Sequence, residues 1–165
     1  MDESAELLAC IPRLRRYARA LLGGRAEADD LVQDTLERGW TKLHLYRRGT
    51  DLRAWLFTVM HNVHLNRRRG ERPEVPLDDA PEAATDGGQE RALALRDLDA
   101  ALARLPVEQR EVLLLVVLED MSYEETARTL GVPVGTVMSR LSRARERMRR
   151  LMQGEPVAER LKVVK

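Results

Sequence analysis

The sequence of 165 residues has little cysteine and few aromatic residues. Cys10 is the only cysteine, so neither an internal disulfide nor a cysteine-based zinc site can form. Aromatic residues make up 4% of the chain, and strand-forming residues do not cluster, whereas Leu, Ala, Arg and Glu are abundant. This composition predicts an all-α protein of one or two small domains.

Long apolar runs are also missing from the sequence. The longest uninterrupted run, Val112–Leu118, is far shorter than the roughly 20 residues that a membrane span requires. The amino-terminus carries Asp2, Glu3 and Glu6, unlike the basic start of a secretion signal. We therefore expect a cytoplasmic protein that does not insert into membranes.

The sequence contains no constellation typical of an enzyme, such as a phosphate-binding glycine loop, a metal-ligand cluster or a nucleophile paired with a base. We expect no catalytic activity, no cofactor and no metal. His61 and His64 lie one helical turn apart, and neutral surface histidines are favoured there over a metal or pH-sensing role. A redox role for Cys10 is similarly disfavoured.

The net charge of +1 conceals an uneven distribution along the chain. Residues 1–70 carry 13 Lys/Arg and 9 Asp/Glu, residues 71–99 carry 3 and 9, and residues 100–165 carry 12 and 9. Helical periodicity disappears in the acidic block, which is rich in proline and glycine. The expected organisation is a helical domain over residues 1–70, a flexible acidic linker over 71–91, a second helical domain over 92–153 and a tail over 154–165.

Apolar residues at helical spacing predict three helices in the first domain. The first helix stops at Gly23-Gly24 and contains Pro12, where it either starts or kinks. Gly39 interrupts the second helix and should cost up to about 1 kcal/mol relative to alanine. Asp51 can cap the third helix. The apolar side of the second helix is expected to comprise Ala28, Leu31, Val32, Leu36, Trp40 and Leu43.

The second domain carries the pattern of a helix-turn-helix. Ser122 and Glu125 have the spacing of a capping box at the start of a short helix. Ala127 is small where two helices would cross closely, and Gly131 supplies a left-handed turn at little cost. These offsets together predict a helix-turn-helix followed by a long last helix.

The orientation of the last helix follows from its apolar stripe. Residues Val137, Leu141, Ala144 and Met148 recur at spacings of four, three and four, so they should be buried. The opposite face near the helix start would then meet base edges in the major groove of DNA. The candidate contacts with bases and phosphates are Thr136, Met138, Ser139, Arg140, Ser142 and Arg143.

Two groups of motifs in this chain resemble one family. The stretches SYEETA (residues 122–127) and VPVGTVMSRLSRAR (residues 132–145) closely resemble region 4 of the extracytoplasmic-function (group 4) sigma factors. The stretch ADDLVQDT (residues 28–35), followed by Trp40, LRAWL at 52–56, Asn62 and an arginine run, resembles region 2. The resemblance covers roughly residues 5–70 and 92–152, in the order of the family.

The resemblance implies a dissociable subunit of bacterial RNA polymerase that directs promoter recognition, and an anti-sigma factor as a further partner. Region 4 would read the −35 element as duplex DNA through the helix face described above. Region 2 would dock on the clamp helices of core RNA polymerase through Asp30, Gln33 and Asp34. It would hold the melted −10 strand of promoter DNA through Arg48, Gly49, Thr50, Asp51, Asn62, Arg67, Arg68 and Arg69.

Several assignments stay open at the level of sequence. Trp55 lies on an apolar helical face and is more typical of a core residue than of a base-stacking one. Asn62 fits a base contact and a helix-bridging role equally well. Met138 stands where relatives often carry Lys or Arg. Two other functions are also compatible with the pattern: a self-sufficient helix-turn-helix regulator, and a sigma-like decoy that binds an anti-sigma factor without contacting promoters.

Overall fold

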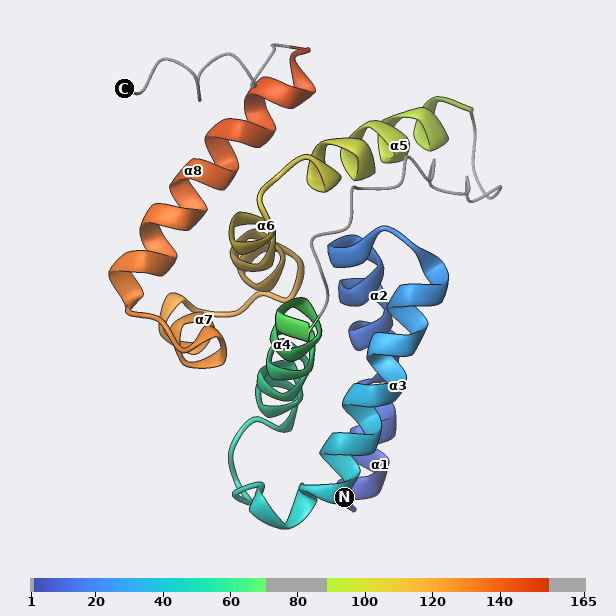
Figure 1. The fold of residues 1–165 in the computed structure, drawn as a ribbon, viewed down its shortest axis with the longest axis vertical. Helices are drawn as coiled ribbons and strands as arrows, with labels where there is room; N and C mark the ends of the chain where they lie inside the picture. Colours follow the sequence, from blue (N-terminus) through green and yellow to red (C-terminus); the bar gives the residue numbers. More distant parts are fainter. Residues whose placement is uncertain (1, 71–88, 155–165) are drawn as a thin grey trace.

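The computed structural model describes residues 2–70 and 89–154, and the described chain is all-α, as expected (Figure 1). The amino-terminal half, residues 2–70, comprises α1 (Glu3–Ala9), α2 (Ile11–Leu22), α3 (Arg25–Thr41), a 3₁₀ turn η1 (Leu43–Leu45) and α4 (Leu52–Gly70). The carboxy-terminal half, residues 89–154, comprises α5 (Gln89–Ala103), α6 (Val107–Leu113), a π-helical turn η2 (Leu114–Leu118), α7 (Tyr123–Leu130) and α8 (Val134–Met152). None of these helices is long and apolar enough to cross a membrane.

The expected acidic linker lies almost entirely outside the described residues, as does the expected tail beyond Gly154. Helix α5 already begins at Gln89, so residues 89–91, which the sequence assigned to the linker, are helical. Helix α6 runs directly into the π-helical turn η2, so the chain is helical without interruption from Val107 to Leu118.

Proline at position 12 starts a helix. Helix α1 ends at Ala9, and α2 begins at Ile11 with Pro12 in its first turn, where a missing N–H leaves no hydrogen bond unmade. The expected cap of α4 is also formed, because Asp51 Oδ1 accepts a hydrogen bond from the Ala54 N–H at 3.3 Å.

The apolar side expected for α3 was wrong at Trp40, which is 59% exposed. A spacing of four residues exceeds a full helical turn by about 40°, so a series of such steps drifts away from the buried face. Gly39 takes the buried position instead. A Cβ atom there would lie 3.0 Å from Leu56 Cδ2, so glycine permits the close approach of α3 to α4.

The predicted stripe of α8 is confirmed at Val137, Leu141 and Ala144, which are buried against α6 and α7, whereas Met148 is half-buried. Helix α5 is anchored by its carboxy-terminal end through the buried Leu102. Farther toward its start, Leu98 remains 40% exposed.

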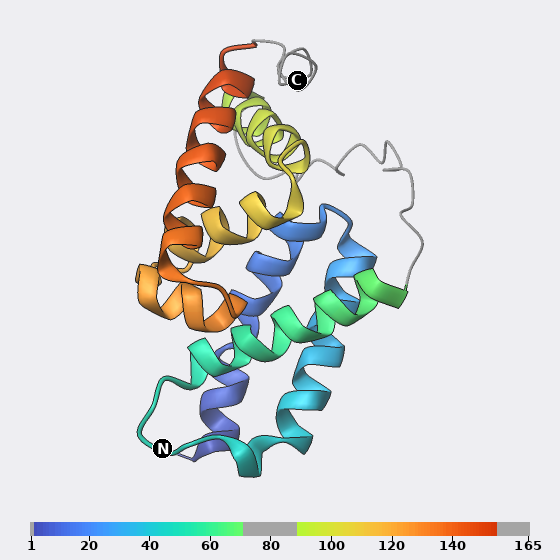
Figure 2. The same ribbon diagram turned by 60° about the vertical axis from the view of Figure 1, so that its left-hand side comes forward.

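The two halves of the chain pack against each other around one continuous apolar core. Helix α7 lies against α4, and α2 lies against α5, α6 and η2 (Figure 2). This packing brings groups together that are 47 to 103 positions apart in the sequence.

Candidate nucleic-acid interface

The helix-turn-helix predicted from the sequence is formed by α7 and α8. Ser122 Oγ accepts a hydrogen bond from the Glu125 N–H at 3.0 Å, which is one of the two bonds of a capping box. The reciprocal bond, from the Ser122 N–H to the Glu125 carboxylate, is not formed between these two residues. Gly131 ends α7 in the left-handed conformation, with φ of 67°. The Val132 N–H then reaches the Ala127 carbonyl at 3.1 Å and closes the turn.

Helix α8 presents a polar face opposite its buried stripe. Ser139, Ser142 and Arg143 are all exposed there, and Met138 beside them is 53% exposed. The other two candidates, Thr136 and Arg140, are half-buried. The short polar side chains stand near the start of the helix, the part of a recognition helix that contacts base edges in other helix-turn-helix proteins.

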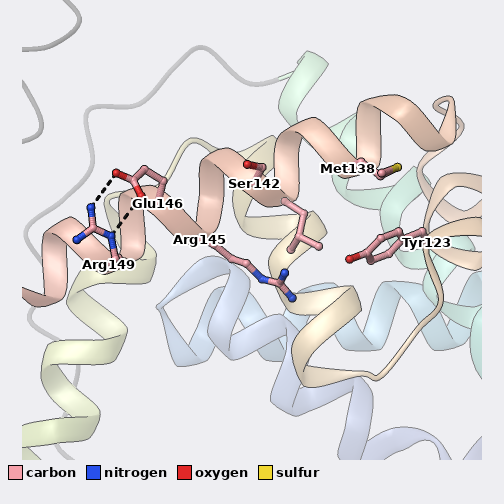
Figure 3. A pocket seen from close by; sticks show the side chains of 7 residues that line it. Tyr123, Met138, Ser142, Arg145, Glu146 and Arg149 are labelled. Carbon is pink, nitrogen blue, oxygen red and sulfur yellow. Dashed lines mark hydrogen bonds and ion pairs between the residues drawn. The ribbon is translucent and has the colours of Figure 1, made fainter.

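The carboxy-terminal part of α8 carries a carboxylate among its arginines (Figure 3). Glu146 accepts hydrogen bonds from Arg149 and Arg150, each at 2.9 Å at closest. These bonds hold the pKa of Glu146 at about 2, so it is ionised at neutral pH. Glu146 therefore offsets positive charge on this part of the helix.

A shallow groove of about 490 Å³ runs beside the polar face of α8. Met138 and Leu141 contribute apolar side chains to it, and Arg145 extends along the same side of α8 as Tyr123 (Figure 3). The residues that line it are Tyr123, Met138, Leu141, Ser142, Arg145, Glu146 and Arg149.

The residues predicted to contact polymerase share the surface of α3. Asp30 and Gln33 are exposed, and Asp34 is half-buried. Arg67 of α4 makes ion pairs with both acids, at 3.2 Å from Asp30 Oδ2 and also with Asp34 Oδ2. Two predicted surfaces, one for polymerase and one for DNA, are therefore in direct contact.

The residues predicted to hold a melted strand lie along α4 and the loop before it. Residues 48–51 are exposed, and Gly49 adopts a positive φ of 88°. Asn62 is exposed, which argues against a role in bridging buried helices. Trp55 is half-buried, with its ring 5.6 Å from that of Tyr46, so it belongs to the base of the loop. Arg68 and Arg69 are exposed at the end of the helix.

The histidine pair is not on the surface, contrary to the expectation from the sequence. His61 Nδ1 lies 3.1 Å from Glu111 Oε2, and His64 Nε2 lies 3.7 Å from the other oxygen of the same carboxylate. Glu111 belongs to α6 in the other half of the chain, and the sequence around the histidines does not indicate this contact. Burial lowers the pKa of His64, and Glu111 opposes the shift only in part.

Two further polar groups join the halves, and neither was anticipated from the sequence. The Glu119 side chain is fully buried and pairs with Arg16 at 3.3 Å, while Arg53 donates to the Glu119 carbonyl at 2.6 Å. Arg110 donates to three carbonyls, those of Leu21 at 2.5 Å, Leu105 at 2.7 Å and Ala103 at 3.0 Å. The only local indication of these contacts was that charged residues stand at both ends of the apolar run 112–118.

Cys10 lies half-buried at the junction of α1 and α2. Burial is the main cause that raises the pKa of its thiol, so little thiolate forms at neutral pH. This environment is typical of a structural cysteine.

The neutral state of His64 leads to a testable pH dependence. Because its pKa is lowered in the packed protein, its contribution to stability is complete above the ordinary value of 6.5 and is lost as the pH falls below it. The groups that face it are Glu111, Arg68, His61 and Arg110. In urea unfolding at pH 7.5 and 5.5, we expect His64→Gln to lose less stability on acidification than the wild type. His44→Gln, at an exposed position, should follow the wild type, and an identical decline in all three would contradict the assignment.

Comparison with known proteins agrees with both halves of this description. Residues 7–61 match the family described as the Sigma2 domain of PhyR, and residues 95–148 match Sigma-70, region 4. The ECF RNA polymerase sigma factor EcfG of Rhodopseudomonas palustris is 40% identical over 150 residues, which are 89% of this chain and 83% of that protein.

Solved structures show the same fold. The sigma factor RpoE of Bartonella quintana, in complex with the anti-sigma factor NepR, superposes with a TM-score of 0.77 at 36% identity and 98% coverage of both chains. The anti-anti-sigma factor PhyR of the same organism, also complexed with NepR, superposes over 89% of this chain and 49% of its own, with a TM-score of 0.62. At 16% identity, PhyR supports the fold alone. The coverage of both halves by sequence and structure shows that the chain belongs to the family of ECF RNA polymerase sigma factors.

Proposed function

We propose that this protein binds core RNA polymerase and directs it to promoters by reading a −35 element as duplex DNA and a −10 element as a melted strand. The observation that carries the proposal is the exposed polar face of α8, with Ser139, Ser142 and Arg143 opposite the stripe that packs into the core. Arginine pairs bidentately with guanine, and serine hydroxyls accept or donate to several bases. The flanking Arg140 is suited to the phosphate backbone.

The amino-terminal half would supply the second contact with the promoter. The exposed loop at residues 48–51 directly precedes α4, and the exposed Asn62 lies within α4. Asp51 and Asn62 are 11 positions apart, which corresponds to about 16 Å along a helix axis. We therefore expect the loop and Asn62 to hold different nucleotides of the strand. Arg68 and Arg69 add the cations that a single-strand groove requires.

We further propose that an anti-sigma factor controls this protein. The related RpoE of Bartonella quintana was solved in complex with NepR, at 98% coverage of both chains. An anti-sigma factor that covers α8 and the surface of α3 would block promoter and polymerase together.

A direct experiment tests this function. Purified full-length protein is added to core polymerase, and run-off transcription is measured from a library of genomic promoter fragments, in the absence of any anti-sigma factor. We expect initiation from a small set of promoters that share two elements, and none from core alone. If core with the protein initiates no better than core alone, the proposal fails.

A second candidate function is that of a sigma-like decoy, which titrates an anti-sigma factor and does not initiate transcription. It is favoured by one observation, the match of residues 7–61 to a family described from PhyR. The exposed polar face of α8 argues against it, since a protein that does not contact promoters requires no base-contacting arginine such as Arg143. A decoy would relieve inhibition of another sigma factor in the transcription assay, would give no transcripts with core polymerase, and would tolerate Arg143→Ala.

The acid on α8 provides a test of the DNA contact. Glu146→Gln should release Arg149 and Arg150 from their carboxylate partner and make the surface more positive. We expect holoenzyme carrying it to bind promoter DNA about two- to fivefold more tightly at low salt, with a steeper dependence on salt concentration. Glu108→Gln, an exposed acid on α6, removes the same charge away from α8 and serves as the control. Equal effects of both changes would contradict a contact between this part of α8 and DNA.

A further inference from the structure

Arg67 is held by the two acids that are predicted to bind polymerase. Its Nη2 atom lies 3.2 Å from Asp30 Oδ2, pairs with Asp34 Oδ2 and donates to the Asp30 carbonyl at 3.4 Å. The contact joins the carboxy-terminal end of α4 to α3, which α4 crosses (Figure 2). The arginine side chain is 27% exposed, whereas those of Asp30 and Asp34 are 68% and 42% exposed, so the acids remain accessible from solvent.

The same arginine belongs to the cluster predicted to hold the −10 strand. Its neighbours Arg68 and Arg69 are exposed and available to a backbone phosphate. The Arg67 guanidinium is instead engaged with carboxylates. Cations or hydrogen-bond donors of a surface that binds Asp30 and Asp34 would compete with Arg67 for the same oxygen atoms.

We propose that Arg67 couples polymerase docking to capture of the −10 strand, because it can pair either with Asp30 and Asp34 or with the strand. Docking engages Asp30 and Asp34 with cations of the polymerase, and the freed guanidinium then turns to the strand backbone. The protein alone therefore presents a weaker site for single-stranded DNA than the holoenzyme does. This inference rests on the proposed function and adds to it a link between its two binding surfaces.

The strength of this coupling is limited by the exposure of the acids. Partly exposed ion pairs contribute little to free energy, so their loss changes an affinity by about two- to fivefold. Linkage requires that core polymerase raise the affinity for the strand by the same factor by which the strand raises the affinity for core. The coupling can therefore be measured from either side.

The experiment uses the full-length protein, core polymerase and a single-stranded −10 oligonucleotide. For Arg67→Ala, we expect the affinity for core to rise about two- to fivefold, because docking no longer breaks the ion pairs between Arg67 and the acids. We expect the affinity of the holoenzyme for the oligonucleotide to fall by a similar factor. A residue that only fastens α4 to α3 would weaken both interactions on replacement, so opposite signs identify the coupling.

Two further variants complete the test. Arg15→Ala removes one exposed charge from α2 and controls for net charge. It should not shift the affinity for core and the affinity for the oligonucleotide in opposite directions. In an Asp30→Asn, Asp34→Asn background, Arg67→Ala should no longer strengthen core binding. Unchanged or weakened core binding by Arg67→Ala, with wild-type helicity by circular dichroism, would overturn the inference. Failure of the wild type to initiate with core would instead refute the proposed function.

Discussion

Replacing Arg143 with alanine is expected to reduce initiation from promoters that carry the −35 element by about 10- to 100-fold. The side chain is exposed on α8 opposite the buried stripe, in the position from which an arginine reaches base edges. A bidentate arginine–guanine pair contributes about 1–3 kcal/mol of discrimination, which corresponds to about 5- to 150-fold and brackets this range. The measurement is multi-round transcription with reconstituted holoenzyme on the wild-type promoter and on promoters with each −35 position changed.

The pattern across promoters identifies the role of Arg143. The variant should lose its preference at one base pair and keep it at the others. Arg140→Ala, three positions earlier and half-buried, should weaken binding to all sequences alike if it contacts only phosphate. A uniform loss for Arg143→Ala would place this side chain on the backbone and would contradict the assignment of the reading face.

Replacing Arg110 with alanine is expected to lower the free energy of unfolding by about 2–4 kcal/mol. Its guanidinium donates to the carbonyls of Leu21, Ala103 and Leu105, so truncation leaves two partly buried acceptors and one exposed acceptor without their donor. Leu21 belongs to the amino-terminal half, so the packing of the two halves should loosen as well. Urea unfolding measures the first effect, and energy transfer between dyes on α3 and α8 measures the second.

A lysine at the same position provides the control for charge. Arg110→Lys keeps the cation but has one ammonium group in place of the planar fork, so it should recover only part of the stability. Exposed Arg128→Ala on α7 should change stability by less than about 0.5 kcal/mol. If Arg110→Ala had no more effect than Arg128→Ala, the contact with Leu21 would not contribute to the packing of the halves.

The elements that local rules govern were predicted well from the sequence. The turn at Gly131, the cap at Ser122 and the buried stripe of α8 depend on backbone conformation and on helical periodicity, both of which are written in a few neighbouring residues. Pro12 was restricted to two outcomes, and the structure shows the helix start.

The errors occurred where distant segments meet. Trp40 was assigned to the buried side, because the sequence does not show that α4 approaches α3 at Gly39; steps of four residues carry Trp40 away from that face, and it is exposed. His61 and His64 were expected on the surface, since neither has a local reason for burial. Their partner Glu111 lies some 50 positions away.

The sequence by itself determined an all-α chain with a helix-turn-helix at its end, because composition, caps and apolar periodicity act over a few residues. It also determined which side chains of α8 face outward, since a helix fixes their directions once one stripe is buried. Only the tertiary structure decided that the two halves share one core, that Glu111 and Glu119 are buried between them, and that Arg67 engages the acids of α3. These contacts depend on the relative placement of helices, which no local pattern specifies.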